Sequence, residues 1–269
     1  MVKKLFKYEI FYYVKRLLPF YIVMLSVAAF TRFIEIFERD ALVFDIVYTS
    51  SIIAYVVALV AGIAAPFILA IMRFYKNLYT AEGYLSFTLP VTPTQHIFVK
   101  TATAMLFDMV SFALAIISFV IVSLGDLGYE ISEAIKYLFR IYFERLKVHG
   151  GFYIAEVVLF IFVGSILSLF VFYTCITIGQ LAKKNRVAAA VGVYFGLYFI
   201  EQIIGTIFVI AVTLVSEQEW WIDFLEKVMK EIKTYIHIGI VGYTLLLAIV
   251  GTGFFFINRR IMRKKLNLE

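Results

Sequence analysis

The stretch VYTSSIIAYVVALVAGIAAPFILAIM, residues 47–72, decides the fold of this chain because it carries no charged side chain over 26 residues. About 20 consecutive apolar residues are enough to cross the hydrocarbon core of a bilayer as an α-helix. A run of this length exceeds that minimum, so it either tilts in the membrane or projects beyond it. The stretch therefore predicts a transmembrane helix.

Five more apolar runs of similar character lie along the chain. The six predicted spans are Leu17–Ile34, Val47–Met72, Thr101–Leu124, Phe152–Leu181, Val187–Val215 and Tyr235–Ile257. The composition agrees, because 63% of the 269 residues are hydrophobic and 16% are charged, against about 45–50% and about 25% in soluble domains. The short alternating segments of a membrane barrel do not occur. The pattern predicts an all-α integral membrane protein with one membrane domain over residues 1–269.

The lysine and arginine residues sort to one side of these spans. Sixteen of the 25 lie in the segments 1–16, 73–100, 182–186 and 258–269. Basic residues near the ends of transmembrane helices concentrate on the cytoplasmic side. This distribution predicts that both termini are cytoplasmic. The same distribution accounts for the net charge of +6. We attribute this charge to membrane topology and to contact with anionic lipids, and not to nucleic-acid binding.

Cysteine and histidine exclude several kinds of site. The single cysteine, Cys175, excludes a disulfide scaffold and a metal cluster of cysteines. The three histidines, His96, His149 and His237, lie on different segments and form no ligand pair. We therefore expect no metal site and no catalytic histidine.

The first 16 residues are basic and aromatic. Phe6, Ile10, Tyr13 and Leu17 follow helical spacing, so one face of this segment is apolar, with lysines nearby to reach lipid phosphates. The pattern favours an amphipathic elbow helix in the inner membrane interface. A disordered basic tail is the alternative.

Two loops on the opposite side, residues 125–151 and 216–234, carry apolar residues at helical spacing between charges. We expect a short helix in each, lying on or just above the outer leaflet. Trp220 and Trp221 suit this position, because an indole can keep its N–H in water. The alternative is that both are ordinary connecting loops without a role in transport.

The longest cytoplasmic connection, residues 73–100, is polar and rich in aromatic side chains. Thr92, Pro93 and Gln95 form a capping-box sequence, which predicts that a new helix begins at Pro93. An aromatic surface rimmed with charge favours docking of another protein. Packing of the aromatic side chains back onto the bilayer interface is the alternative.

The run NLYTAEGYLSFTLPV, Asn77–Val91, resembles the loop between the second and third helices of ABC exporter permeases of the type-2 branch, which have the type V exporter fold. The elbow helix, six spans and cytoplasmic termini agree with that family. The resemblance implies a bacterial cytoplasmic membrane, a dimer with a second permease chain, identical or different, and two ABC ATPase subunits docked on a coupling helix in this loop. The residues to which it assigns this coupling are Tyr79, Glu82, Gly83, Tyr84, Leu85 and Phe87.

The chain contains no phosphate-binding G-x-x-x-x-G-K-[ST] motif. We therefore expect no cofactor on this chain, with ATP and Mg²⁺ on the partner ATPase, and no enzymatic activity of its own. The large outer domain of the bigger family members is absent from this sequence, which argues against a large extracellular recognition function.

A few polar residues lie inside the predicted spans. Glu201, beside Gln202, falls at the centre of the fifth span, where a charge costs at least about 2.5–3.5 kcal/mol. Asp108 lies in the third span and could pair with a lysine near the cytoplasmic side. Gly192 and Gly196 supply small residues for close helix approach. We expect these five residues to line a substrate path or a dimer seam, although a structural role for each is the alternative.

Together these features predict the permease subunit of an ATP-driven exporter that moves an amphipathic substrate such as a peptide, lipid or drug. A proton-coupled secondary transporter that uses Glu201 or Asp108 is the alternative. An intramembrane enzyme is a third possibility, which no catalytic motif in the spans supports.

Overall fold

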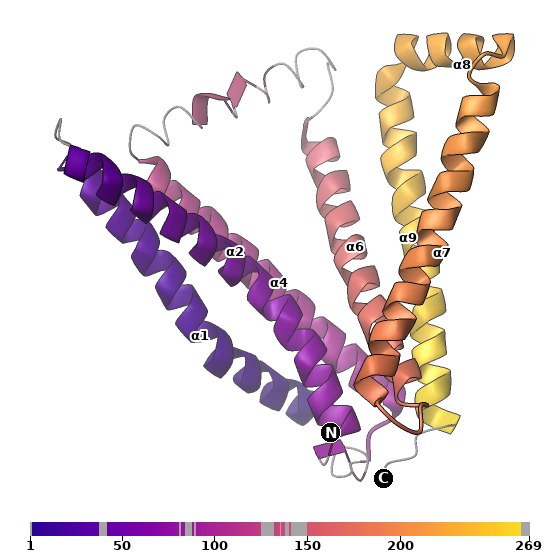
Figure 1. The fold of residues 1–269 in the computed structure, drawn as a ribbon, viewed down its shortest axis with the longest axis horizontal. Coiled ribbons are helices and arrows are strands. Elements are labelled where there is room, and N and C mark those ends of the chain that lie inside the picture. The colour runs from indigo at the N-terminus through magenta and orange to yellow at the C-terminus, as the bar shows by residue number, and fades with distance from the viewer. Residues whose placement is uncertain are drawn as a thin grey trace. The chain divides into compact units, whose positions relative to one another are not determined.

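The computed structural model describes residues 2–37, 42–80, 82–83, 88, 90–124, 132–134, 136–137, 140 and 150–264. Among these residues it contains helices, turns and short connections but no strand. Its helices are α1 (Val2–Glu35), α2 (Leu42–Tyr79), α4 (Pro93–Ser123), α6 (Gly150–Gly179), α7 (Arg186–Val215), α8 (Glu219–Lys230) and α9 (Ile232–Lys264) (Figure 1). All except α8 are long and apolar enough to cross a membrane. These six helices confirm the predicted spans and indicate a multi-pass membrane protein.

The helices group into two compact units, Met1–Arg145 and Leu146–Glu269. The first unit contains α1, α2 and α4, and each of these helices packs against the other two. In the second unit α6 packs against both α7 and α9, and α8 joins the last two.

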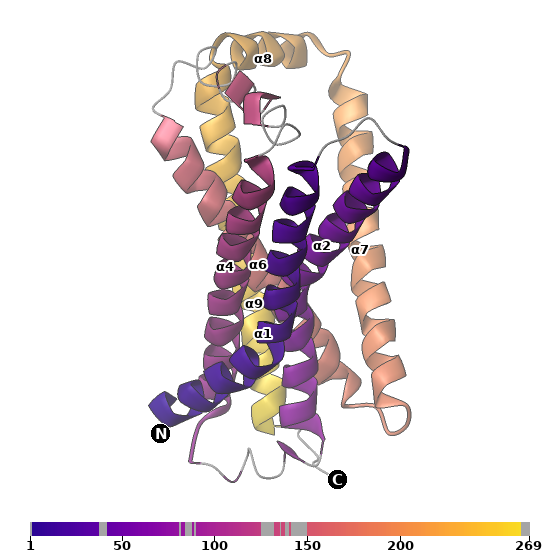
Figure 2. The same cartoon turned by 90° about the vertical axis from the view of Figure 1, so that its left-hand side faces the viewer.

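Helix α1 is continuous from Val2 to Glu35 and contains Pro19. Its N-terminal part runs in a different direction from the rest (Figure 2). A proline inside a helix removes one backbone hydrogen bond and commonly bends it. The disordered tail considered for residues 1–16 is therefore wrong, because residues 2–16 are helical.

Small polar contacts join the apolar helices of the first unit. The Tyr21 and Ser111 hydroxyls lie 2.7 Å apart, which ties α1 to α4. The Thr31 hydroxyl donates to the carbonyl of Ser51 at 3.2 Å, which ties α1 to α2. All these groups are buried, and a hydrogen bond compensates the cost of removing each hydroxyl from water.

Helix α4 begins as its sequence predicts. Thr92 is the N-cap, its side chain accepts from the backbone N–H of Gln95, and Pro93 occupies the first turn. The Gln95 side chain in turn accepts from the Thr92 N–H at 2.9 Å. This capping box is confirmed, and it fixes where the 73–100 connection ends and α4 starts.

Polar contacts also hold the second unit together. The buried Asn258 amide on α9 donates to the Thr174 hydroxyl on α6 at 2.8 Å. At the end of α6, a Cβ added to Gly179 would lie 2.6 Å from the backbone nitrogen of Ala190. The absence of a side chain at Gly179 is therefore what allows α7 to approach α6 so closely.

Candidate functional site

A buried ion pair joins the first and third helices of the first unit. The Lys100 ammonium on α4 lies 2.7 Å from the Glu9 carboxylate on α1. Their side chains are only 3% and 2% exposed, respectively. Removing two charges from water is costly, so such a pair persists only where each charge is closely matched by its partner.

Arg73, near the end of α2, extends the pair into a network of four charges. Its Nε lies 3.2 Å from the second oxygen of Glu9. Its Nη1 lies 3.1 Å from the Glu82 carboxylate in the connection between α2 and α4. Two cations and two carboxylates therefore balance, and the network links three helices to the loop. We call Glu9, Arg73, Glu82 and Lys100 the basal network.

An aromatic ring covers the basal network. The guanidinium carbon of Arg73 lies 3.9 Å from the centre of the Tyr12 ring. Arg16 lies over the same ring at 4.0 Å and donates a hydrogen bond to the Tyr12 hydroxyl. Cation–π contacts of this kind contribute about 0.5–2 kcal/mol each. They hold the guanidinium of Arg73 in the orientation from which it reaches both carboxylates.

The helical spacing of the N-terminal segment explains why Glu9 points inward. Glu9, Tyr13 and Leu17 lie four residues apart and are all buried. Tyr13 stacks on Phe107 of α4 with ring centres 5.1 Å apart. The packed face is therefore rotated from the expected apolar stripe, because Phe6 and Ile10 are only partly buried.

The predicted coupling residues are only partly within the described chain. Tyr79 is buried and its ring lies 5.8 Å from that of Phe74. Glu82 is 59% exposed and belongs to the basal network. A Cβ added to Gly83 would lie 2.5 Å from the carbonyl oxygen of Leu78, so the close approach of the backbone requires glycine there. The remaining predicted coupling residues, Tyr84, Leu85 and Phe87, lie outside the described residues.

Asp108 is half-buried on α4. We expected that it could pair with a lysine near the cytoplasmic side, but Lys100 bonds to Glu9 instead. Among the described residues, no cation lies within ion-pair distance of Asp108.

The four predicted polar and small residues of the fifth span are exposed. Helix α7 is described throughout, and none of its residues is buried. Glu201 and Gln202 are exposed at its centre. A Cβ added to Gly192 or Gly196 would meet no atom within 4 Å. Glu201 lies roughly opposite Gly192 and Gly196 around the helix, at about 100° per residue, so two different sides of α7 are uncovered within the second unit.

A second polar cluster joins α6 to α9. His237 Nδ1 on α9 lies 2.7 Å from the Glu156 carboxylate on α6, and the Tyr153 ring stacks on the His237 ring at 3.8 Å. Sequence reasoning missed this contact because the residues lie more than 80 positions apart. It couples the adjoining ends of α6 and α9.

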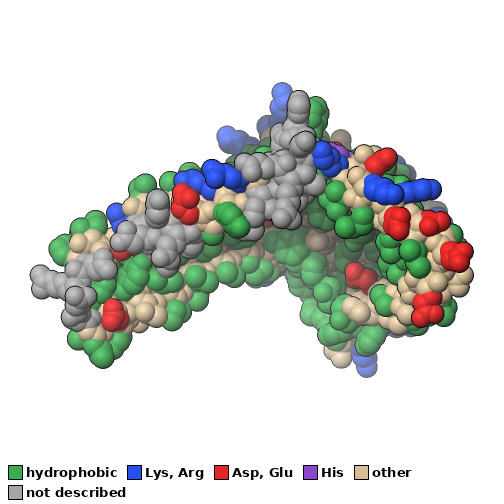
Figure 3. Space-filling model, turned by 90° about the horizontal axis from the view of Figure 1, so that it is seen from above, with side chains coloured by type: hydrophobic (Ala, Val, Ile, Leu, Met, Phe, Trp, Pro, Cys, Tyr) green, Lys and Arg blue, Asp and Glu red, His purple; other side chains and the backbone are tan. Residues whose placement is uncertain are grey.

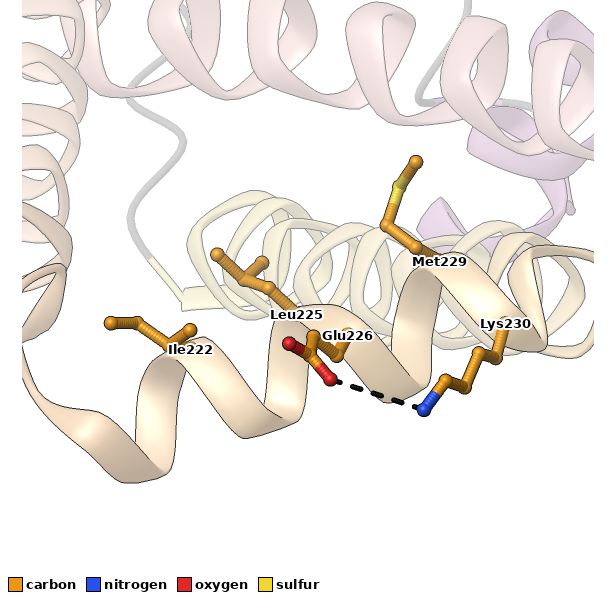
Figure 4. Close-up of a pocket in the computed structure, with 5 residues that line it drawn as sticks. All are labelled: Ile222, Leu225, Glu226, Met229 and Lys230. Carbon is orange, nitrogen blue, oxygen red and sulfur yellow. Dashed lines mark ion pairs between the residues drawn. The ribbon is translucent and has the colours of Figure 1, made fainter.

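Helix α8 lies within the segment where a short helix was expected, and it is amphipathic. Charged side chains gather over the end of the molecule that carries it (Figure 3). Ile222, Leu225 and Met229 form one exposed flank beside the ion pair of Glu226 and Lys230, around an open hollow of about 410 Å³ (Figure 4). The short helix expected in the 125–151 loop lies mostly outside the described residues.

Comparisons with known protein families, with curated proteins and with solved structures found no match to this chain. No group of three histidine, cysteine, aspartate or glutamate side chains that could hold a metal ion occurs among the described residues. The class that the fold defines is an all-helical, multi-pass membrane protein, and the basal network is the ion-pair cluster that joins the most charged groups among the described residues.

Proposed function

We propose that this chain is the membrane-spanning permease subunit of an ATP-driven exporter in the bacterial cytoplasmic membrane. The observation that carries the proposal is the 73–100 connection. Its sequence resembles the coupling loop of type-2 ABC exporter permeases, and its Glu82 belongs to the basal network, which reaches α1, α2 and α4. In this proposal both termini are cytoplasmic and the N-terminal part of α1 is the elbow helix.

The basal network suits the transmission of force from the loop to the helices. A push on the loop moves Glu82, which is bonded to Arg73 at the end of α2. Arg73 shares Glu9 with Lys100, so α1 and α4 follow α2. The permease performs no covalent chemistry, and ATP and Mg²⁺ bind to the partner ATPase. Its part is to adopt two conformations whose balance the ATPase cycle shifts.

A second permease chain is part of this proposal. Glu201 is exposed on one side of α7, Gly192 and Gly196 are exposed on the opposite side, and within its unit the helix packs mainly on α6. A carboxylate facing lipid at the middle of the bilayer is unfavourable by at least about 2.5–3.5 kcal/mol. A partner helix or a water-filled path over this face removes that cost. The aromatic and aliphatic lining of such a path favours an amphipathic substrate.

Co-purification with an ATPase tests the proposal directly. The first test is whether a reading frame for an ATPase with Walker motifs adjoins the one for this chain. If it does, the two proteins are expressed together, purified as a complex and reconstituted into liposomes. We expect the two to co-purify and the complex to hydrolyse ATP. Proton-driven transport by the chain alone, with no ATPase bound, would instead support a secondary transporter using Asp108 or Glu201.

A charge reversal tests the coupling loop within that complex. Glu82→Lys adds a third cation to the basal network, next to Arg73, and removes one of its two carboxylates. We therefore expect loss of transport-coupled ATP hydrolysis while the chain still inserts into the membrane. Glu133→Lys is the matched control, because Glu133 is similarly exposed at 51% and also bonds a single cation, Lys136, at 2.9 Å. Equal activity of the two variants would contradict the assignment of this loop.

A further inference from the structure

Three arginines line one face of the last turns of α9. Phe256, Arg259, Arg260 and Arg263 border an open groove of about 570 Å³. The spacing of three, four and seven residues from Phe256 places all four side chains on one side of the helix. The described wall of the groove comes from this helix alone.

The packing of α9 on α6 fixes the direction in which this arginine face points. Gly251, Asn258 and Met262 are buried, and the Asn258 amide also donates to the carbonyl of Phe170 on α6 at 3.4 Å. At about 100° per residue, Arg260 and Arg263 lie roughly 140–200° around the helix from Asn258. The arginine face is therefore held away from α6.

The depth of the arginines matches the phosphate layer of a bilayer. The apolar part of α9, residues 235–257, is about 35 Å long at about 1.5 Å per residue. The hydrocarbon core is about 30 Å thick. When this part fills the core, Arg259 is the first of the three arginines beyond its edge. The predicted orientation places that edge in the cytoplasmic leaflet.

The arginines have no acidic partner among the described residues, since none of the three forms an ion pair there. A guanidinium binds phosphate with two parallel hydrogen bonds, which makes arginine better suited than lysine to this ligand. On the same face, Phe256 lies one turn and Ile249 about three turns from Arg260 towards the membrane centre, and they are 54% and 72% exposed. Thr252 and Gly253 occupy the turn between them. Two exposed apolar side chains therefore follow the arginines on this face.

We propose that the arginine face of α9 is a binding site for an anionic phospholipid of the adjoining leaflet. The arginines bind the phosphate of the headgroup, and Phe256 and Ile249 contact its acyl chain. A free phosphate ion would use the arginines but would leave Phe256 and Ile249 uncovered. The site is independent of the substrate that the chain transports.

Lipid titration of the full chain in a neutral detergent tests this site. Phosphatidylglycerol is added with phosphatidylcholine as the neutral comparison, and bound lipid is counted by native mass spectrometry. Each arginine near a headgroup contributes about 1 kcal/mol, or about fivefold in affinity. We expect R259Q/R260Q/R263Q to bind phosphatidylglycerol on the order of 100-fold more weakly.

Two matched variants separate a specific site from general charge. R259K/R260K/R263K keeps the charge but loses the two-bond geometry, so its affinity should fall between those of the wild type and the glutamine variant. K183Q/K184Q/R186Q removes the same charge from the loop before α7 and should bind within about threefold of the wild type. If the glutamine triple does not fold, R260Q alone should show the fivefold loss.

Three results would overturn the proposal. The first is binding by the arginine-to-glutamine triple within about threefold of the wild type, and the second is an equal loss in the 183–186 control. The third is displacement of the lipid by millimolar inorganic phosphate, which would identify a site for a soluble anion.

Discussion

Glu9→Gln is the sharpest perturbation of the basal network, because it removes one charge and keeps the shape of the side chain. Among the described residues Glu9 is the only carboxylate within ion-pair distance of Lys100, whereas Arg73 keeps Glu82 at 3.1 Å. The substitution therefore leaves the Lys100 ammonium buried and unpaired. Removing one partner of a buried ion pair costs about 3–5 kcal/mol.

That cost converts to a measurable loss of thermal stability. One kcal/mol shifts the melting midpoint of a chain of this size by about 2–4 °C, so we expect Glu9→Gln to lower it by about 6–20 °C. The assay is a thermal scan of the full chain in detergent at one fixed scan rate, because unfolding of membrane proteins is commonly irreversible. Glu133→Gln, which breaks an exposed pair, should change the midpoint by less than about 2 °C.

Lys100→Met provides the decisive comparison. It leaves Glu9 bonded to Arg73 at 3.2 Å, so it should be less damaging than Glu9→Gln. In the double variant no buried ammonium is left unpaired, and we expect it to be more stable than Glu9→Gln alone. Additive losses, or a Glu9→Gln midpoint within about 2 °C of the wild type, would refute the reasoning.

Three further outcomes follow from the same structure. Gly83→Ala should reduce ATP hydrolysis by the reconstituted complex, because its Cβ would meet the Leu78 carbonyl oxygen at 2.5 Å, whereas Gly239→Ala meets no atom within 4 Å and should be silent. Asn258→Ala should lower thermal stability by about 1–3 kcal/mol, since it leaves the buried Thr174 hydroxyl without this donor; a change below about 0.5 kcal/mol would count against that bond. If α7 packs on α7 of a second copy of this chain, Gly205→Cys in a Cys175→Ser background should form a disulfide-linked dimer. Monomer alone on a non-reducing gel would argue against an identical partner at this position.

The features that sequence predicted well are those with local causes. The spans follow from long runs of mostly apolar residues. The start of α4 follows from Thr92, Pro93 and Gln95, which lie within one turn and form the capping box. A cap or an apolar run needs no information from distant parts of the chain. For these features the pattern and the structure agree.

The basal network could not be predicted in the same way. Glu9 and Lys100 are separated by 91 positions, and no local pattern pairs them. One signal was available: Glu9 is the only acidic residue among the first 16, which otherwise carry five basic ones. A single acidic residue in such a basic segment indicates that it has a specific cationic partner. The packing of α1 on α4 is needed to identify that partner as Lys100.

The residues that surround Glu201 could not be predicted from the sequence, for a different reason. Its position at the centre of an apolar span indicates that something covers it. In the structure α7 packs mainly on α6 within its unit and leaves Glu201 exposed. No described residue of that unit covers Glu201, so the pattern within α7 could not identify what does.

The grouping of the helices into two sets of three has a consequence for how the protein is made. An odd number of crossings leaves the ends of each unit on opposite faces of the bilayer. In the topology that we propose, with both termini cytoplasmic, the second unit therefore inserts with a polarity opposite to that of the first. In that topology the long link that precedes α6 has to be translocated, so insertion of the second unit depends on translocation machinery.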